Sequence, residues 1–304
     1  MEVGQTIHLV VDKANLRLDR YISQSCKELS RSFIQKLIEE GSVTVNAQAA
    51  KPSLKTKTGD KIVINLPPPQ PPYPTLIPEN LPLAIVYEDS DLLVIDKPAG
   101  ITVHPAPGNP DHTLVNAILA HCPDILALDT SVRPGIVHRL DKNTSGLMVV
   151  AKKKDAQLNL STQLKNHHVL KKYLVLVRGH PSLEEGDIKA PIGRHPKNRK
   201  KMAVVPGGRE AHTSYRVVKP FKDYTLVEAI TRTGRTHQIR VHFSSIGCPV
   251  VGDAVYGVRV PYLERQFLHA CLLGFRLPGT GEWVEFRSEL PAELELALEH
   301  LVHS

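Results

Sequence analysis

The sequence is poor in cysteine and in long apolar runs, and both shortages exclude classes of protein. Only four of the 304 residues are cysteine, none stands in a C-x-x-C pair, and no Cys/His cluster has the spacing of a zinc site. Scattered thiols fit a reducing compartment better than a disulfide framework. No apolar stretch approaches the length of a membrane span, and no charged-then-apolar leader opens the chain. We therefore expect a cytoplasmic protein with no membrane partner.

Signatures of phosphate and dinucleotide binding are also missing. The chain contains neither a Gly-rich loop followed by Lys-Ser or Lys-Thr nor a G-x-G-x-x-G run. Its paired histidines, His237 and His242, are five residues apart and would lie on different faces of a helix, which argues against a shared metal ion. We expect no metal and no cofactor, so amino-acid side chains would carry any reaction.

Positive charge is what the sequence has in excess. Lysine and arginine number 38 against 31 acidic residues, which gives a formal charge of +7 and a pI near 9.2. A surplus of this sign favours a polyanionic partner, because each phosphate that a cation neutralises releases counterions. Simple solubility explains the same charge, so composition alone leaves both interpretations open. With 41% apolar residues, the chain can bury a packed core.

A proline-rich segment predicts a boundary between two domains. Six of the eight residues 67–74 are proline, which excludes a helix or a central strand and favours an extended, semi-rigid spacer. We therefore expect a small domain over 1–66, a linker over 67–80 and a large domain over 81–304.

The small domain has the pattern of two helices and a short sheet. We expect an amphipathic helix from Leu16, then a second helix with Ser30 as its N-cap and Gly41 as its left-handed C-terminal cap. Two alternating stretches, 43–46 and 61–64, predict strands. The basic residues of this domain are most simply a solvated helix face: Arg17, Arg20, Lys27, Arg31 and Lys36.

The large domain mixes strands and helices, joined mostly by short turns, which predicts an α+β fold with a mixed or antiparallel sheet. Helices are predicted from Thr113, after Asp155 and Thr236 as N-caps, and from Pro291 as a first-turn proline. Strands are predicted at 85–87, 92–95, 147–151, 173–177, 214–218, 225–230, 267–275 and 283–286, the first two forming a hairpin.

A polar run between two apolar stretches is the first candidate for chemistry. Residues 138–146, with the sequence HRLDKNTSG, separate an apolar 135–137 from a predicted buried strand. These residue types also make ordinary turns, and composition alone favours that simpler interpretation. Arg139 argues against it, because a guanidinium two residues from Asp141 can hold the carboxylate ionised and oriented. Asp141 would then be charged at neutral pH and able to act as a nucleophile or base.

A second polar run, 232–242, contains an arginine on a predicted helix. If the helix starts after Thr236, His237 and Arg240 share one face, while Ile239 lies on the apolar face. Arg240 can then point away from the core and present a rigid fork to a carboxylate or phosphate. A surface arginine on an amphipathic helix is the simpler alternative.

Two clusters of basic residues lie in the same domain. Lys152–Lys154 follows the predicted strand after Asp141, and the eight residues Arg194–Lys201 hold five lysines or arginines. Each cluster fits a solvated loop, but two of them in the domain with the candidate site favour a nucleic-acid groove.

Two sets of motifs resemble known families. The small domain is similar to the S-four RNA-binding domain, named after a small-subunit ribosomal protein, over 18–22, 30–32 and 37–46 and again at 59–62. It departs from that family at Ala47, where glycine is usual after the asparagine. GIVHRLDKNTSG at 135–146 resembles the signature of the RluA-type pseudouridine synthases. Two further stretches of that family follow, RTHQIRVH at 235–242 and GDAVYG at 252–257, and the HPAPG stretch at 104–108 together with the appended domain is most similar to the RluD-like branch.

The resemblance implies a function. It implies an enzyme that isomerises specific uridines of structured RNA to pseudouridine, with large-subunit ribosomal RNA as the substrate of the RluD-like branch. It also implies a catalytic domain built on a long, mostly antiparallel sheet with an active-site cleft, and a reaction that needs no cofactor. We expect RNA or a pre-ribosomal particle as the partner, and a monomer.

The resemblance also assigns roles by position. Asp141 matches the essential aspartate of the family, and Arg240 matches its basic partner. Tyr173 matches the tyrosine that stacks on the target base and accepts its proton. The expected substrate contacts are Arg139, which matches the arginine that fills the space left by the base, and His138, Thr144 and His237.

Two other functions compete with this interpretation. One is a non-catalytic RNA-binding factor of ribosome assembly on the same fold, which would predict loss of the aspartate, yet Asp141, Tyr173 and Arg240 are all present. The other is a metal-dependent hydrolase that would use His138 and Asp141.

Overall fold

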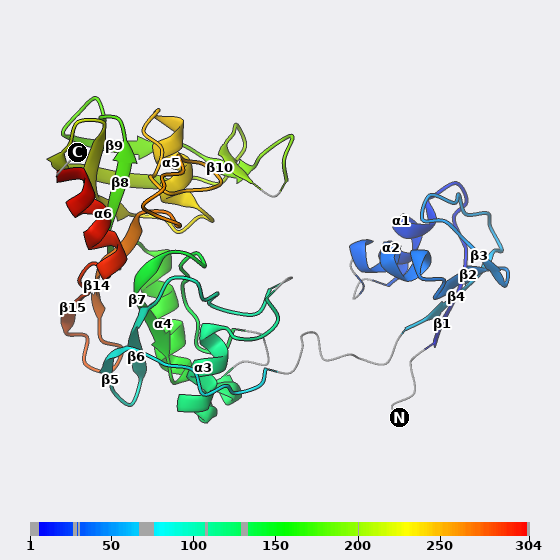
Figure 1. Cartoon of the computed structure of the whole chain (residues 1–304). Helices are drawn as coiled ribbons and strands as arrows, with labels where there is room; N and C mark the ends of the chain where they lie inside the picture. Colours follow the sequence, from blue (N-terminus) through cyan, green and yellow to red (C-terminus); the bar gives the residue numbers. More distant parts are fainter. Residues whose placement is uncertain are drawn as a thin grey trace. The chain divides into compact units, whose positions relative to one another are not determined.

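The computed structural model describes residues 6–26, 29, 31–66, 76–106, 109–128, 133–199 and 201–302 (Figure 1). The chain divides into two compact units, Met1–Thr75 and Leu76–Ser304.

Unit 1 contains two helices and a four-stranded antiparallel sheet in the order β1-β4-β2-β3. Both predicted helices and both predicted strands are present, and Gly41 has the expected left-handed conformation with a φ of 78°. The predicted N-cap Ser30 lies outside the described residues. The elements are β1 (Thr6–Val10), α1 (Leu18–Ser25), α2 (Arg31–Glu39), β2 (Val43–Val45), β3 (Gln48–Ala49) and β4 (Lys61–Asn65).

The core of unit 1 forms where the apolar stripes of both helices meet the sheet. Leu18 and Ile22 of α1 pack with Ile34 and Leu37 of α2 against strand residues such as Ile62, all of them at most 1% exposed. This core is small, as expected for a segment of this length.

Unit 2 is built on a nine-stranded sheet in the order β5-β6-β7-β14-β8-β13-β12-β9, with β15 paired to β14. Its pairs are antiparallel except for β7 and β14, which run parallel. The predicted α+β class with a mixed, mostly antiparallel sheet is therefore confirmed. The strands are β5 (Ile85–Glu88), β6 (Leu92–Lys97), β7 (Ser145–Ala151), β8 (Leu170–Arg178), β9 (Glu185–Lys189), β12 (His212–Pro220), β13 (Tyr224–Thr231), β14 (Leu268–Arg276) and β15 (Trp283–Arg287).

The helices of unit 2 lie close to their predicted positions, but three starting residues were wrong. Lys153, not Asp155, is the N-cap of α4, and His237, not Thr236, is the N-cap of α5. Pro291 is not the first residue of α6, which begins at Ala292. The Pro291 carbonyl accepts hydrogen bonds from the first helical turn. The helices are α3 (Leu114–His121), the 3₁₀ helix η1 (Pro123–Leu128), α4 (Lys154–Lys165), α5 (Gln238–Ser245) and α6 (Ala292–Val302).

A two-stranded hairpin extends from unit 2 beside α5 (Figure 1). It consists of β10 (Ile192–Arg194) and β11 (Met202–Val204), and its connection carries the basic cluster predicted from the sequence. We call residues 192–204 the basic arm. Lys200 of that cluster lies outside the described residues.

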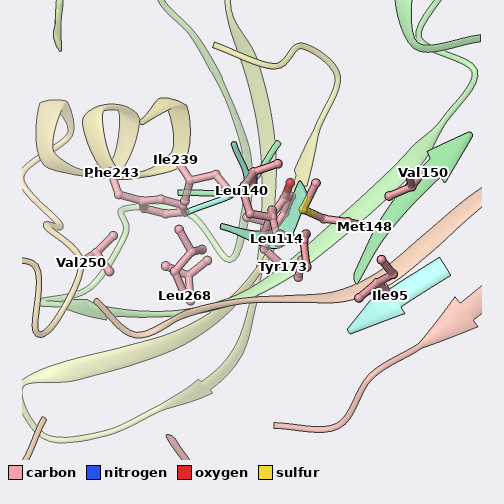
Figure 2. Packing of buried hydrophobic residues seen from close by; sticks show 14 of the residues in the cluster. Ile95, Leu114, Leu140, Met148, Val150, Tyr173, Ile239, Phe243, Val250 and Leu268 are labelled. Carbon is pink, nitrogen blue, oxygen red and sulfur yellow. The ribbon is translucent and has the colours of Figure 1, made fainter. Parts of the chain in front are cut away.

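The largest core cluster of unit 2 holds the strands and α5 in place beneath the site described below. Ile239 and Phe243 of α5 face a group that includes Leu140, Tyr173 and Leu268 (Figure 2). Because Leu140 is only 5% exposed, its burial anchors the polar run on either side of it.

The predicted linker is described only in its last part, because 67–75 lies outside the described residues. Leu76 packs against the core of unit 2, and the Asn116 side chain of α3 donates a hydrogen bond to the carbonyl of Ile77 at 2.8 Å. Residues 76–80 therefore belong to unit 2. A search of the described residues finds no helix with the length and hydropathy needed to cross a bilayer.

Candidate active site

The two polar runs singled out in the sequence meet in one cleft of unit 2. Its volume is about 410 Å³, and its walls come from the 133–144 segment, β8 and the 231–240 turn. The cleft is lined by all seven candidate residues: Asp141, Tyr173, Arg240, Arg139, His138, Thr144 and His237.

An ion pair lies at the centre of the cleft. The Arg240 Nη1 atom donates to Asp141 Oδ2 at 2.8 Å, and the two residues are 99 positions apart in the chain. The other side of the guanidinium is held by Asp253, through Nε at 2.6 Å and Nη2 at 2.9 Å. Arg240 is thus fixed in orientation by a buried carboxylate and presents one N–H to Asp141.

The two carboxylates that share this arginine differ in solvent exposure. The side chains of Asp253 and Arg240 are 0% and 7% exposed, whereas that of Asp141 is 19% exposed. Asp253 also accepts hydrogen bonds from the backbone of Val255 and Tyr256. Asp253 is therefore fully coordinated within the protein, while Asp141 keeps an oxygen that faces the cleft.

The charges of this cluster stabilise each other against burial. Burial opposes ionisation of Arg240, but hydrogen bonds and charges from Asp253 and Asp141 outweigh it and raise the pKa of the guanidinium. Burial likewise opposes ionisation of Asp253, and the bond to Arg240 reverses this effect, so that the pKa of Asp253 is lowered. The pair is consequently ionised at neutral pH.

The predicted pairing of Arg139 with Asp141 needs correction. The arginine that hydrogen bonds to Asp141 is Arg240, while Arg139 directs its Nη1 to His104 Nε2 at 3.5 Å. The charge of Asp141 still acts on Arg139 and partly offsets the lowering of its pKa by burial. Arg139 is exposed and lies next to the carboxylate, where it can contact a ligand.

Hydrogen bonds from the backbone and from buried side chains shape the loop that carries Asp141. The Thr144 N–H donates to the Asp141 carbonyl at 3.1 Å and closes the turn. Arg265, only 7% exposed, donates to the Asn143 carbonyl at 3.2 Å and to Ser145 Oγ at 3.1 Å. Thr144 is 2% exposed, and its hydroxyl accepts from Gln266, so its observed contacts are within the protein.

A close approach of two strands ends the same loop. Gly146 has a φ of 114°, and a Cβ atom there would lie 2.4 Å from the Ala270 carbonyl oxygen. Glycine is therefore required where β7 pairs in parallel with β14.

A buried lysine supports the loop from behind. Lys97 is 0% exposed and donates to three carbonyls, those of Pro98 at 2.7 Å and of Ile101 and Lys142 at 3.1 Å. Burial lowers its pKa to about 7, the nearby Arg265 acts in the same direction, and Asp141 opposes them. Lys97 ties the end of β6 to the residue that follows Asp141.

The histidines of the cleft are neutral at physiological pH. Burial lowers the pKa of His138 to about 3 and that of His104 to about 4. His138 Nε2 accepts the Val149 N–H at 3.0 Å, so this nitrogen is not free to bind a metal, which disfavours the hydrolase alternative. Burial also lowers the pKa of His237, against the charge of Asp141.

Tyr173 and Lys171 enter the cleft from β8. They are two residues apart on a strand, so their side chains share one face, and each is 9% exposed. Burial raises the pKa of Tyr173 to about 12, although a hydrogen bond with Thr231 opposes this shift. The phenol is therefore protonated at rest, which argues against a resting tyrosinate base. Burial lowers the pKa of Lys171 to about 8, so its ammonium is still largely charged at neutral pH.

Cations dominate the described lining of the cleft. Asp141 is the carboxylate among these residues, against six cationic side chains: Arg133, Arg139, Lys165, Lys171, Arg235 and Arg240. Such a lining fits a polyanionic ligand.

One group of side chains away from the cleft has ligand atoms close enough for a metal ion. Glu88, His121 and Cys122 place theirs within 4.8 Å of one another. Lys152 Nζ already lies 2.7 Å from Glu88 Oε1 and neutralises that carboxylate, and burial raises the pKa of the Cys122 thiol. Both features disfavour metal binding by this group.

Sequence reasoning gave no role to Asp253, Lys97 or Arg265. Each is a charged residue within or beside an apolar run, and a buried charge needs a partner. That signal was available for Asp253, within 248–255, and for Lys97, at the end of 92–97.

Comparison with known proteins agrees with this geometry. A family model described as RNA pseudouridylate synthase matches residues 91–245, and the S4 domain model matches residues 16–62. The chain is 44% identical to an uncharacterized RNA pseudouridine synthase of Bacillus subtilis, over 94% of each chain. It is 43% identical to the ribosomal large subunit pseudouridine synthase D of Zymomonas mobilis, over 99% of this chain and 98% of that one.

A solved structure also points to a pseudouridylate synthase fold. The human RNA pseudouridylate synthase domain containing 1 protein superimposes with a TM-score of 0.56 at 28% identity, over 74% of this chain and 97% of that one. Fold, cleft and relatives together define an RNA-modifying isomerase. The chain belongs to the RluA-type family of RNA pseudouridine synthases and carries an N-terminal S4 domain.

Proposed function

We propose that this enzyme converts specific uridines of large-subunit ribosomal RNA to pseudouridine, with Asp141 as its essential carboxylate. The observation that carries the proposal is the Asp253–Arg240–Asp141 arrangement, in which an immobilised guanidinium orients a partly exposed carboxylate in a cationic cleft. The choice of ribosomal RNA rests on the name of the Zymomonas relative, which is similar over nearly its full length.

The reaction explains why the carboxylate faces an open cleft. A uridine within a stacked RNA must be flipped out before its glycosidic bond can be reached, at a cost of a few kcal/mol. The base is then detached, rotated and rejoined through carbon. Asp141 can assist by attacking the anomeric carbon, by attacking the ring or by removing the adjacent sugar proton, and each route needs an ionised oxygen. Atoms are only rearranged, so the overall reaction consumes no co-substrate.

Tyr173 and its neighbours are proposed to hold the flipped base. An aromatic ring recovers roughly 1–3 kcal/mol by stacking on a base. Because its phenol is protonated at rest, we assign Tyr173 to stacking and hydrogen bonding, and accepting a proton is the less favoured part of its expected role. Arg139 is proposed to fill the space left by the base, and His138, Thr144 and His237 to line the nucleoside site.

The experiment that tests the proposal is a map of pseudouridines in ribosomal and transfer RNA. A strain without the gene should lack a small set of large-subunit pseudouridines, and the wild-type gene should restore them. A gene carrying Asp141→Asn should not restore them, although the protein is folded and present at an equal level. If that variant restores every site, Asp141 is not the essential carboxylate. If only transfer RNA sites change, the ribosomal assignment is wrong.

A further inference from the structure

Tyr256 connects the basic arm, His237 and Arg240. Its hydroxyl accepts the Met202 N–H of the basic arm at 2.8 Å and lies 2.8 Å from His237 Nδ1. Its ring lies against the Arg240 guanidinium, with 5.1 Å from Cζ to the ring centroid. A single half-buried side chain therefore touches the arm, the candidate histidine and the partner of Asp141.

The hydrogen bonds of Tyr256 favour one of the two nitrogens of His237 as the site of its proton. The hydroxyl has one proton to donate, and the Met202 N–H is itself a donor. Of the two partners, only His237 Nδ1 can accept that proton. His237 then carries its own hydrogen on Nε2, the nitrogen that lies 3.9 Å from Asp141 Oδ1. This separation is too long for a direct hydrogen bond, so an N–H on Nε2 can donate to a substrate group beside the carboxylate.

The backbone of His237 shows that this orientation is held from outside. Its φ of 56° and ψ of 24° place a non-glycine residue in the left-handed region, at the N-cap of α5. Such a conformation costs energy and persists where surrounding contacts determine it. Gln238 holds the turn before the helix by accepting the Arg235 N–H, and Tyr256 holds the imidazole.

The arm is attached to the body at the same tyrosine. Lys201 Nζ donates to the Val255 carbonyl at 2.8 Å, one residue before Tyr256, and lies 6.0 Å from the centre of its ring. Met202 and Tyr256 also pack together against a cluster that includes Val241 of α5. A shift of the arm therefore acts on the hydroxyl that His237 uses.

We propose that Tyr256 is a positioning residue that keeps His237 as an Nε2–H donor beside Asp141, aligns Arg240, and couples both to the seating of the basic arm. This inference rests on the proposed function, since it takes the Asp141 cleft as the reactive site. It adds a residue outside the set expected to touch substrate, and it gives the arm a role in organising the site.

The first test is a ¹⁵N-histidine NMR titration of the full chain, which reads out the His237 tautomer and pKa without any need for activity. The charged or titratable groups that face His237 are Asp141, Arg240, Asp253, Arg139 and Tyr256. Tyr256→Phe keeps the ring and removes the donor that stabilises the neutral imidazole. The pKa of His237 should then rise by about 0.5 to 1 pH unit, as expected for the loss of one hydrogen bond.

The second test measures single-turnover conversion of labelled RNA against pH. With Tyr256→Phe, the acidic limb should move upward with the histidine pKa, the rate on that limb should fall by about three- to tenfold, and RNA affinity should stay within about twofold. Tyr87→Phe is the matched control, because it removes the same atom from a tyrosine of β5 whose phenol is hydrogen bonded to Asp89. It should change neither the titration nor the pH profile.

Lys201→Ala tests the coupling to the arm. It removes the bond to Val255 and the cation near the Tyr256 ring but keeps the tyrosine and its hydroxyl, and it should move the His237 titration in the same direction by a smaller amount. An unchanged titration in this variant would refute the coupling. An Nδ1–H tautomer in the wild type, or an unchanged titration in Tyr256→Phe, would refute the positioning role. Either result leaves the proposed function standing, because that function is tested by whether the wild-type protein forms pseudouridine.

Discussion

Each unit contains an aspartate bound to arginine, and the two differ in what remains free. In unit 1, Asp19 is 0% exposed and accepts hydrogen bonds from Arg17, Arg31 and Gln35. Burial opposes its ionisation, but these bonds lower its pKa far below the usual range. In unit 2, Asp141 accepts a single guanidinium N–H from Arg240 and is 19% exposed. A fully coordinated carboxylate fixes a fold, whereas a partly coordinated one is available for chemistry.

Asp253 shows the same distinction within one cluster. It shares Arg240 with Asp141, yet its oxygens are occupied by that arginine and by backbone N–H groups. We therefore assign structural support to Asp253 and reactivity to Asp141. Substitutions of the three aspartates, and of the arginine that two of them share, test this distinction.

The largest effect is expected at the shared arginine. Arg240→Met leaves two carboxylates with no cationic partner in the cluster, which should lower the free energy of unfolding by about 3–5 kcal/mol and conversion by about 10²–10³-fold or more. Thermal unfolding and single-turnover conversion measure the two losses. Arg240→Lys keeps the charge without the planar guanidinium fork. Its stability and its conversion rate should lie between those of Arg240→Met and the wild type. A stable Arg240→Met protein would show that the cluster does not support the fold.

Asp253→Asn should destabilise the protein in a pH-dependent way. The pKa of Asp253 is lowered in the folded state, so its stabilisation is complete above the unfolded carboxyl pKa of about 3.9 and is lost as the pH falls through the lower folded value. The variant should be about 2 kcal/mol less stable at pH 7, and this deficit should shrink below about pH 4. Unfolding midpoints from pH 3 to 8 test this, and a deficit that is constant with pH would contradict it.

Asp19→Asn should separate folding from chemistry. Arg17 and Arg31 are exposed and can rehydrate, so the loss in unit 1 should be about 1–2 kcal/mol. Hydrogen exchange should quicken in α1 and α2, while the single-turnover rate at saturating RNA stays at the wild-type value. The matched control is Glu39→Gln, at an exposed position of α2. A large fall in the saturated rate would show that Asp19 does more than support unit 1.

The smallest effect concerns two neighbouring lysines. Lys171 lines the cleft, whereas Lys172 points to the other face of β8 and pairs with Glu228 at 3.2 Å. Lys171→Gln should weaken RNA binding several-fold and reduce the slope of log affinity against log salt by about 1. Lys172→Gln should leave that slope unchanged. Equal slopes in both variants would show that the cleft cation makes no phosphate contact.

Apolar patterning predicted β4, which alternates, and β7, which is a continuous apolar run, but it missed β1 and several short or highly charged strands. β9 reads EGDIK and has no apolar stripe, and β3 is two residues long, so their pairing depends on tertiary contacts that no local pattern encodes. The starting residues of α4 and α5 were wrong because local capping preference named Asp155 and Thr236. The observed N-caps are Lys153 and His237, and neither makes a side-chain capping hydrogen bond.

The candidate site followed from the resemblance more than from local reasoning. Proximity in sequence pointed to Arg139 as the partner of Asp141, but burial of Leu140 between them orients both side chains, and the partner comes from α5. The left-handed His237 and the contact between Tyr256 and the arm depend on packing between segments far apart in the chain. Neither feature has a signature in the sequence.

Single-turnover conversion by Asp141→Asn, measured on labelled large-subunit RNA beside its unfolding midpoint, tests the central distinction most directly. The substitution keeps the shape of the side chain and removes the charge of a carboxylate that the fold does not enclose. Our account predicts no detectable pseudouridine and an unfolding midpoint close to that of the wild type. Conversion at the wild-type rate would contradict it, and so would a protein that loses activity only because it unfolds.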